Sequence, residues 1–312
     1  MSYTGPDLEP SPTGRPRRSV LTVALAALVP GALIGWLVYE TAGGSGGSAE
    51  GAAGSSASRP AAAPPASSEP PAADDKKPAP SPSGSVAEAL KGKVVVIDPG
   101  HNPGNFQHTA EINRKVDIGS AMKECDTTGT STNDGYLEAR FTLDVAHRLR
   151  DLLTVQGVTV KLTHDAERPF GPCIDERARI GNEAKADAVV SIHADGVGTG
   201  NRGFHMILPG SVTAGAADTR PILAPSRDLG ERIAGSFARE TGSAPSNYVG
   251  DGTGLVTRTD LGGLNLSTVA KVFIECGNMR DGADAAQLTS GDWRQRAAKG
   301  ISEGIVSFLR GS

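Results

Sequence analysis

The chain has 312 residues and a formal net charge of -4 at pH 7, which leaves room for one large domain with additional segments. Arg15, Arg17 and Arg18 gather near the start, but no basic stripe elsewhere would follow a phosphate backbone. Composition and charge therefore argue against a nucleic-acid partner.

An uncharged apolar run, VLTVALAALVPGALIGWLV, fills residues 20–38. At about 1.5 Å of helix rise per residue, it can just cross the roughly 30 Å hydrocarbon layer of a bilayer. The arginines before it predict a cytoplasmic tail over 1–18, a membrane anchor over 19–40 and export of the remainder. The alternative is a cleaved signal segment, since the preceding arginine pair has a twin-arginine character. No small-residue cleavage site follows closely, so we favour the anchor.

Residues 41–91 are rich in Ala, Pro, Ser and Gly. Such a composition buries too little apolar surface to offset chain entropy, so it predicts a disordered linker. As a flexible coil, the stretch 41–85 would span about 35–40 Å. A tether of this kind would let a membrane-bound domain act away from the bilayer.

From residue 92 onward, patterns typical of strands alternate with patterns typical of helices. Buried strands are predicted over 93–98, 158–163, 188–192, 203–208 and 269–274. Helices are predicted over 136–156, 174–185, 226–241 and 292–309. This alternation predicts a single layered α/β domain over 92–312, with a largely parallel mixed sheet flanked by helices. The segments 210–220 and 242–254 look like loops framing a groove for peptide or glycan, or forming a lid.

Three cysteines lie in this part of the chain. Cys125 and Cys173 both have loop-like surroundings, and an exported domain lies in an oxidising compartment, so we expect a disulfide between them. Cys276 follows an apolar strand and is expected to be a buried thiol.

Ionisable side chains follow three of the predicted strands. His101 follows the first strand in the turn DPGH, His193 ends the strand SIH, and Glu275 ends the strand FIE. Glu138 begins the first long helix. Ligands of open α/β sheets bind at the carboxyl ends of the strands, so these four side chains should converge there.

Two imidazoles and one carboxylate are the usual protein ligands of a catalytic zinc ion, and the remaining carboxylate could take a proton from water. Each residue alone also has an ordinary structural explanation. A single His after a strand is commonly a satisfied polar residue, a Glu early in a helix suits the helix dipole, and Glu275 could form a salt bridge. The convergence of all four favours a zinc hydrolase.

Several segments in order resemble one known family: VVVIDPGHNPG, YLEARFTLDVAHRLRDLL, ERARIGNEAKADAVVSIHAD and AKVFIECGNMRDGADAAQL. Over residues 93–308 the chain is similar to the zinc-dependent N-acetylmuramoyl-L-alanine amidases of the bacterial cell wall, known as amidase type 3. The resemblance implies zinc ligands at His101, Glu138 and His193 and a catalytic carboxylate at Glu275.

The resemblance also extends to the helix that carries Arg177 and Asn182, which match an R-x-x-I-A-N pattern with Gly181 in place of Ala. We expect both side chains to support the structure or the substrate. The chain departs from the family where Ala139 follows Glu138, and Cys276 replaces a commonly apolar residue. The loop over 102–135 adds Glu111 and Glu124 as competing carboxylates.

The resemblance implies hydrolysis of the amide between N-acetylmuramic acid and L-alanine in peptidoglycan, with Zn2+ as cofactor. Two rivals stay open: an inactive wall-binding or regulatory module with the same fold, and a zinc peptidase that cuts the stem peptide. The sequence contains no H-E-x-x-H helix, which disfavours the common zinc-peptidase architecture. Peptidoglycan and the membrane are the expected partners, and the sequence does not fix the oligomeric state.

Overall fold

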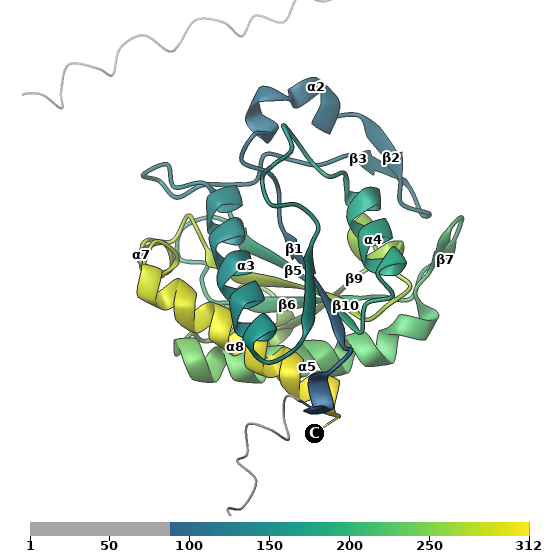
Figure 1. Ribbon diagram of the computed structural model, residues 1–312. Helices are drawn as coiled ribbons and strands as arrows, with labels where there is room; N and C mark the ends of the chain where they lie inside the picture. Colours follow the sequence, from purple (N-terminus) through teal and green to yellow (C-terminus); the bar gives the residue numbers. More distant parts are fainter. Residues whose placement is uncertain (1–87, 312) are drawn as a thin grey trace, which may run out of the picture. The chain divides into compact units, whose positions relative to one another are not determined.

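A six-stranded sheet forms the centre of the computed structural model, which describes residues 88–311 (Figure 1). The predicted tail, anchor and nearly all of the predicted linker lie outside these residues. The linker was predicted to reach residue 91, but Leu90 is fully buried in the main core. The folded part therefore begins earlier than the composition indicated. Within residues 88–311, no helix has both the length and the hydropathy needed to cross a membrane.

The strand order is β4-β1-β5-β10-β6-β9. The first four strands are mutually parallel: β4 (Thr159–Leu162), β1 (Val94–Pro99), β5 (Ala188–Asp195) and β10 (Lys271–Asn278). β6 (His205–Pro209) runs antiparallel to β10, and β9 (Leu255–Arg258) runs parallel to β6. The sheet is therefore mixed and largely parallel, as predicted.

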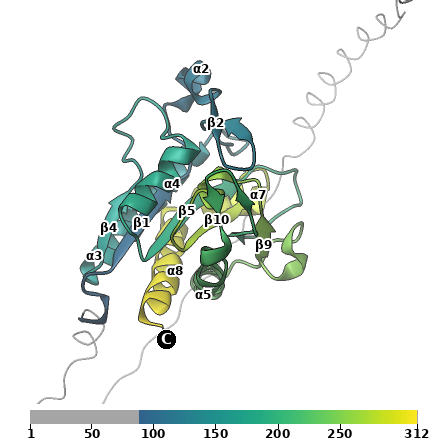
Figure 2. The ribbon, with the colours of Figure 1, turned by 90° about the vertical axis from the view of Figure 1, so that its right-hand side faces the viewer.

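Helices cover both faces of the sheet (Figures 1 and 2). One face carries α3 (Glu138–Val155), α5 (Leu223–Thr241) and α8 (Gly291–Arg310). The other carries α4 (Ile174–Glu183) and the short α6 (Gly262–Asn265). Between β10 and α8 lies α7 (Gly282–Leu288).

Several short helices, turns and hairpins lie outside the central sheet and its long helices. The region over 102–135 contains a 3-10 turn η1 (Asn105–Gln107), α2 (Thr109–Ile112) and the hairpin of β2 (Lys115–Asp117) with β3 (Met122–Glu124). The segments predicted as groove loops contain a second hairpin of β7 (Thr213–Ala214) with β8 (Ala217–Asp218), and the turn η3 (Gly250–Gly252). A further turn, η2 (Arg220–Ile222), leads into α5.

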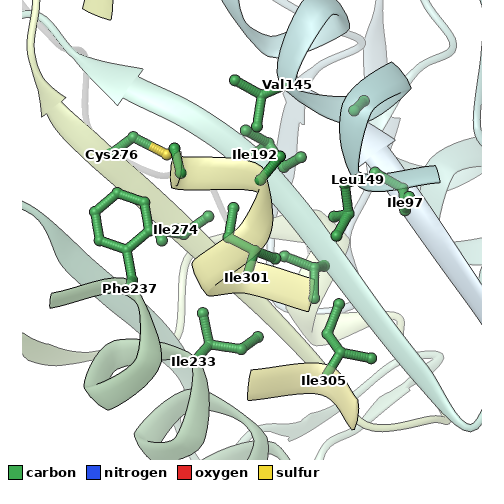
Figure 3. Packing of buried hydrophobic residues seen from close by; sticks show 14 of the residues in the cluster. Ile97, Val145, Leu149, Ile192, Ile233, Phe237, Ile274, Cys276, Ile301 and Ile305 are labelled. Atoms are coloured by element: carbon green, nitrogen blue, oxygen red, sulfur yellow. The ribbon is translucent and has the colours of Figure 1, made fainter. Parts of the chain in front are cut away.

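The main hydrophobic core lies between the sheet and the three-helix face (Figure 3). Alternate strand residues such as Ile97, Ile192 and Ile274 point into it, where they pack among Val145 of α3 and Ile301 of α8. All five of these side chains are fully buried. This layer accounts for the period of three and four residues in the sequences of α3 and α8.

The opposite face of the sheet is apolar in one part and polar in another. Its apolar cluster is small and centres on Val96 and Val189, packed against α4. Two residues further along each strand, the same face carries Asp98 and Ser191, and Lys271 lies beside them on β10. All three polar side chains are at most 1% exposed. The sheet thus carries a buried polar layer on the side that leads to its carboxyl edge.

Candidate active site

The turn after β1 brings His101 to the carboxyl edge of the sheet. A Cβ atom on Gly100 would lie 2.2 Å from Cε1 of His193, so only glycine fits between the two strand ends. His101 itself has a φ of 64°, a left-handed conformation that is uncommon for a non-glycine residue. Such backbone strain is often found at functional sites. This close approach explains why a glycine precedes the histidine in the DPGH turn.

Glu138 and His193 reach the same point from two other elements. Glu138 is the first residue of α3 and is 4% exposed. Its Oε1 lies 3.1 Å from Nε2 of His101 and 3.1 Å from Nδ1 of His193. The three side chains each offer one ligand atom, and these atoms all lie within 4.8 Å of one another. The structure therefore brings together the three residues for which the sequence predicted a metal site.

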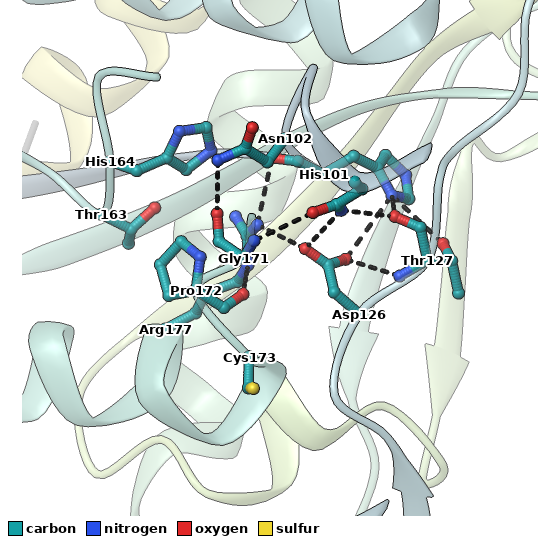
Figure 4. Close-up of polar contacts among 12 residues, drawn as sticks. His101, Asn102, Asp126, Thr127, Thr163, His164, Gly171, Pro172, Cys173 and Arg177 are labelled. Atoms are coloured by element: carbon teal, nitrogen blue, oxygen red, sulfur yellow. Dashed lines mark hydrogen bonds and ion pairs between the residues drawn. The ribbon is translucent and has the colours of Figure 1, made fainter. Parts of the chain in front are cut away.

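The hydrogen bonds behind the two imidazoles show that this cluster suits a cation. Nδ1 of His101 lies 3.1 Å from the carbonyl oxygen of Thr127, which can only accept, so Nδ1 carries the proton (Figure 4). Ser191 donates its hydroxyl proton to Asp98, so its oxygen accepts from Nε2 of His193 at 3.2 Å. The remaining ring nitrogen of each histidine faces the Glu138 carboxylate, and it carries the lone pair of the ring when the imidazole is neutral. A divalent metal ion would satisfy all three acceptors.

Charge interactions also connect the residues of this cluster. Burial acts to lower the pKa of His101, but the carboxylates of Glu138 and Asp126 outweigh it and raise that pKa well above the usual range. Burial acts to raise the pKa of Glu138, but the two facing imidazoles hold it well below the usual range. Glu138 is thus held as a negative carboxylate between the two imidazoles, and that charge can balance a bound cation.

Glu275 lies on the neighbouring strand, where it pairs with His193 in the parallel register of β10 and β5. Its Oε2 is buried and has no hydrogen-bond partner among the described residues. Burial above all, together with the nearby charges of Glu138 and Asp195, raises the pKa of Glu275 well above the usual range. A carboxyl group with these properties is suited to accept and return a proton.

Two cavities, of about 250 and 280 Å³, share His101, His193 and Phe273 as walls. The larger also contains Glu138 and Glu275, and the smaller extends toward the β2–β3 hairpin and α4. The Phe273 ring stacks on His193 with 5.2 Å between ring centroids. Neither cavity is lined by the segments 210–220 and 242–254, for which the sequence predicted a groove. This part of the wall is formed instead by Arg258, the last residue of β9, and by residues 260–263 after it.

The competing acidic residues lie apart from the cluster. Glu111 is exposed and faces His108 at 3.4 Å, and Glu124 forms an ion pair with Lys115. Glu124 does line the smaller cavity, although it does not join the three-residue cluster. The histidines that match no ligand position in the family pattern are held elsewhere: His147 by Asp165, and His164 by the carbonyl of Pro99 at 3.0 Å.

The two residues expected to give support occupy different places. Arg177 is 4% exposed and lies beneath the site. Asn182 joins α4 to the chain before β10, because its side chain donates to the carbonyl of Leu266 and accepts from the backbone N–H of Thr268, each at 2.8 Å.

The cysteines are arranged as predicted: Cys125 and Cys173 are joined by a disulfide, and Cys276 is a buried free thiol.

Sequence reasoning missed the residues behind the candidate metal ligands. Asp126, Thr127 and Ser191 each contact one of the two imidazoles. A signal for Ser191 was present, because strand alternation places it on the same face as His193. Asp126 and Thr127 lie in an irregular loop, where no periodicity marks them.

Comparisons with known proteins identify the family of the chain. Residues 95–307 match the family model for N-acetylmuramoyl-L-alanine amidase. The chain is 39% identical to N-acetylmuramoyl-L-alanine amidase Rv3717 of Mycobacterium tuberculosis over 70% of this chain and 88% of the relative.

Two solved structures are similar as well. The amidase Ami1 of Mycobacterium smegmatis has a TM-score of 0.65 and 37% identity, covering 72% of this chain and 99% of that one. Ami1 of Mycobacterium abscessus, in its apo form, has a TM-score of 0.64 and 39% identity, covering 70% and 100%. On this evidence the chain belongs to the N-acetylmuramoyl-L-alanine amidase family and is a hydrolase, a peptidoglycan amidase.

Proposed function

We propose that this protein uses a zinc ion, held by His101, Glu138 and His193, to hydrolyse the amide between N-acetylmuramic acid and L-alanine. The observation that carries the proposal is the convergence of three acceptor atoms within 4.8 Å at the wall of a cavity. The type 3 amidase family is generally zinc-dependent, and the donor set fits that ion. When bound, zinc supplies a Lewis acid that acidifies a water ligand and polarises the scissile carbonyl.

Glu275 is proposed as the residue that moves the proton. Its buried Oε2 is free of hydrogen bonds to other described residues and lines the same cavity as the three ligands. There it would accept the proton of the attacking water and pass it to the leaving nitrogen of L-alanine. The raised pKa of Glu275, caused mainly by burial, suits both halves of this transfer.

The proposed site of action is outside the cell membrane. The apolar run over 20–38 and the arginines before it favour an anchor with the catalytic domain exported. The disulfide between Cys125 and Cys173 favours an oxidising compartment. Secretion after signal cleavage is the alternative.

The test is digestion of purified peptidoglycan by the full-length protein, with products identified by mass spectrometry. We expect muramic acid freed of peptide, loss of this product with a strong chelator, and its return with added zinc. Glu275→Gln should lower turnover by at least about 100-fold while zinc stays bound, because it removes only the proton acceptor. Glu231→Gln, at an exposed position paired with Arg227, is the matched control and should retain activity.

Other products would point to the rival functions. Shortened stem peptides would show a peptidase instead of an amidase. Binding to the wall without any products would show an inactive module. Full turnover by the Glu275→Gln protein, or in the presence of chelator, would contradict the proposed mechanism.

A further inference from the structure

Arg177 lies at the centre of a buried polar network beneath the candidate metal site (Figure 4). Its guanidinium has five N–H donors, and each of them has an acceptor in the structure. Those acceptors are Oδ1 of Asp98 at 2.7 Å, Oδ2 of Asp126 at 2.9 Å, and the carbonyls of Pro99 at 2.7 Å, His101 at 3.1 Å and Pro172 at 2.8 Å. One side chain thus fixes the turn after β1 and two carboxylates at once.

One of the two carboxylates, Asp126, lies close to His101. Asp126 lies 3.7 Å from Nδ1 of His101 and accepts from the backbone N–H of Thr127 at 2.8 Å. Thr127 in turn faces the same Nδ1 with its carbonyl and its hydroxyl, each at 3.1 Å. By holding Asp126, Arg177 fixes the acceptors that keep the proton of His101 on Nδ1.

The other carboxylate, Asp98, contacts His193 through Ser191. Asp98 accepts the hydroxyl proton of Ser191 at 2.8 Å, and the Ser191 oxygen lies 3.2 Å from Nε2 of His193. Lys271 contacts the same Asp98 carboxylate at 3.4 Å. This chain of contacts keeps a proton of His193 on Nε2, so that Nδ1, which faces Glu138, is the nitrogen left to bind a metal ion.

A disulfide joins the loop that carries Asp126 to the start of the helix that carries Arg177. Cys125 immediately precedes Asp126, and Cys173 stands before the first turn of α4, one turn ahead of Arg177. The backbone N–H of Ile174 also donates to the carbonyl of Cys125 at 2.7 Å. The loop that carries Asp126 and the helix that carries Arg177 are therefore held together covalently and by hydrogen bonds.

We propose that Arg177 is a positioning residue for metal binding: it holds Asp98 and Asp126, and through them fixes the orientation and tautomer of both histidine ligands. This inference rests on the proposed metal site. Partners behind a ligand commonly set how tightly the metal binds. A lysine could not replace Arg177, since a single ammonium group cannot reach two carboxylates and three carbonyls arranged around a planar fork.

The test is the zinc dissociation constant of the full chain, measured by competition with a chromophoric chelator. Arg177→Lys should bind zinc about 10- to 100-fold more weakly. Arg179→Lys is the matched control, because Arg179 lies on the same helix but is 56% exposed and pairs with Glu183, and its zinc affinity should be unchanged. The visible absorption spectrum of the cobalt-substituted protein should shift in Arg177→Lys and stay unchanged in the control.

A second variant covers the case in which Arg177→Lys does not fold. Ser191→Ala removes one hydroxyl and breaks only the arm to His193, so zinc affinity should fall several-fold while the circular dichroism of the metal-free protein is retained. Wild-type zinc affinity in a folded Arg177→Lys protein, or in Ser191→Ala, would overturn the inference and leave the proposed function standing. Failure of the unaltered protein to bind zinc would overturn both.

Discussion

Asp98 is a buried carboxylate shared by two buried cations. It is 1% exposed and contacts both Arg177 and Lys271. Burial acts to raise the pKa of Asp98, but the two cations outweigh it and hold the pKa far below the usual range. Because the folded pKa is depressed, this carboxylate stabilises the fold above its unfolded pKa of about 3.9, and its contribution is lost as the pH falls below that value.

Asp98→Asn should therefore change both the size and the pH dependence of stability. At pH 7 the free energy of unfolding should fall by about 3–5 kcal/mol, because two buried cations lose their shared carboxylate. Between pH 5 and pH 3 the curve of the variant should be flatter than that of the wild type, since Asn does not titrate. Urea unfolding with a chelator present measures both. Asp151→Asn, at a position 71% exposed, should follow the wild-type curve, and parallel curves for Asp98→Asn would contradict the argument.

The individual residues of the candidate site were predictable where a strand or a helix delivers them. His101 follows β1, and His193 and Glu275 lie in the second halves of β5 and β10, which continue beyond the predicted ends to Asp195 and Asn278. Parallel strands bring these positions to one edge. Asp126 was not predictable, because it is placed by a loop, a disulfide and its contact with Arg177. Tertiary contacts of this kind leave no periodic trace in a sequence.

At the scale of elements, length and apolar pattern together decided what could be predicted. The long helices α3, α5 and α8 and the apolar strands β1, β5 and β10 contain enough residues to show a period. β9 has four residues, and each strand of the β2–β3 hairpin has three. These short strands exist because neighbouring elements supply their partners, as β6 does for β9. Their own residues show no usable pattern.

The packing of α5 against α8 allows a sharp test at this scale. A Cβ atom on Gly304 of α8 would lie 2.5 Å from Cα of Ile233 in α5, so the two backbones meet directly. Gly304→Ala should force the helices apart and lower the free energy of unfolding by about 1–3 kcal/mol.

Gly235→Ala is the opposite case within α5, because, apart from its chain neighbours and the adjacent backbone of α5, no atom of residues 88–311 lies within 4 Å of the added methyl group. This change should raise stability by about 0.5–1 kcal/mol through helix propensity. Urea unfolding of the two variants beside the wild type compares them directly. Equal effects of the two substitutions would show that the helices do not meet as closely as described.

At the scale of the whole molecule, the disulfide between Cys125 and Cys173 bears on the compartment in which the domain is expected to fold. Cys125 and Cys173 are separated by 48 residues in the sequence. Closing a loop of this size contributes about 4 kcal/mol in the chain-entropy model, although measured contributions are often smaller. A bond that braces the loop beside the candidate site is useful only where it stays oxidised, and that condition agrees with the predicted export.

Export and anchoring can be tested together in the native host. We expect the full-length protein in the membrane fraction, resistant to a high-salt wash and released by detergent, because an apolar helix over 20–38 would hold it there. After denaturation without reductant, alkylation should label one cysteine, Cys276, since the other two are paired. A soluble extracellular protein shortened at its N-terminus would show signal cleavage instead. A cytoplasmic protein with three reactive thiols would contradict export altogether.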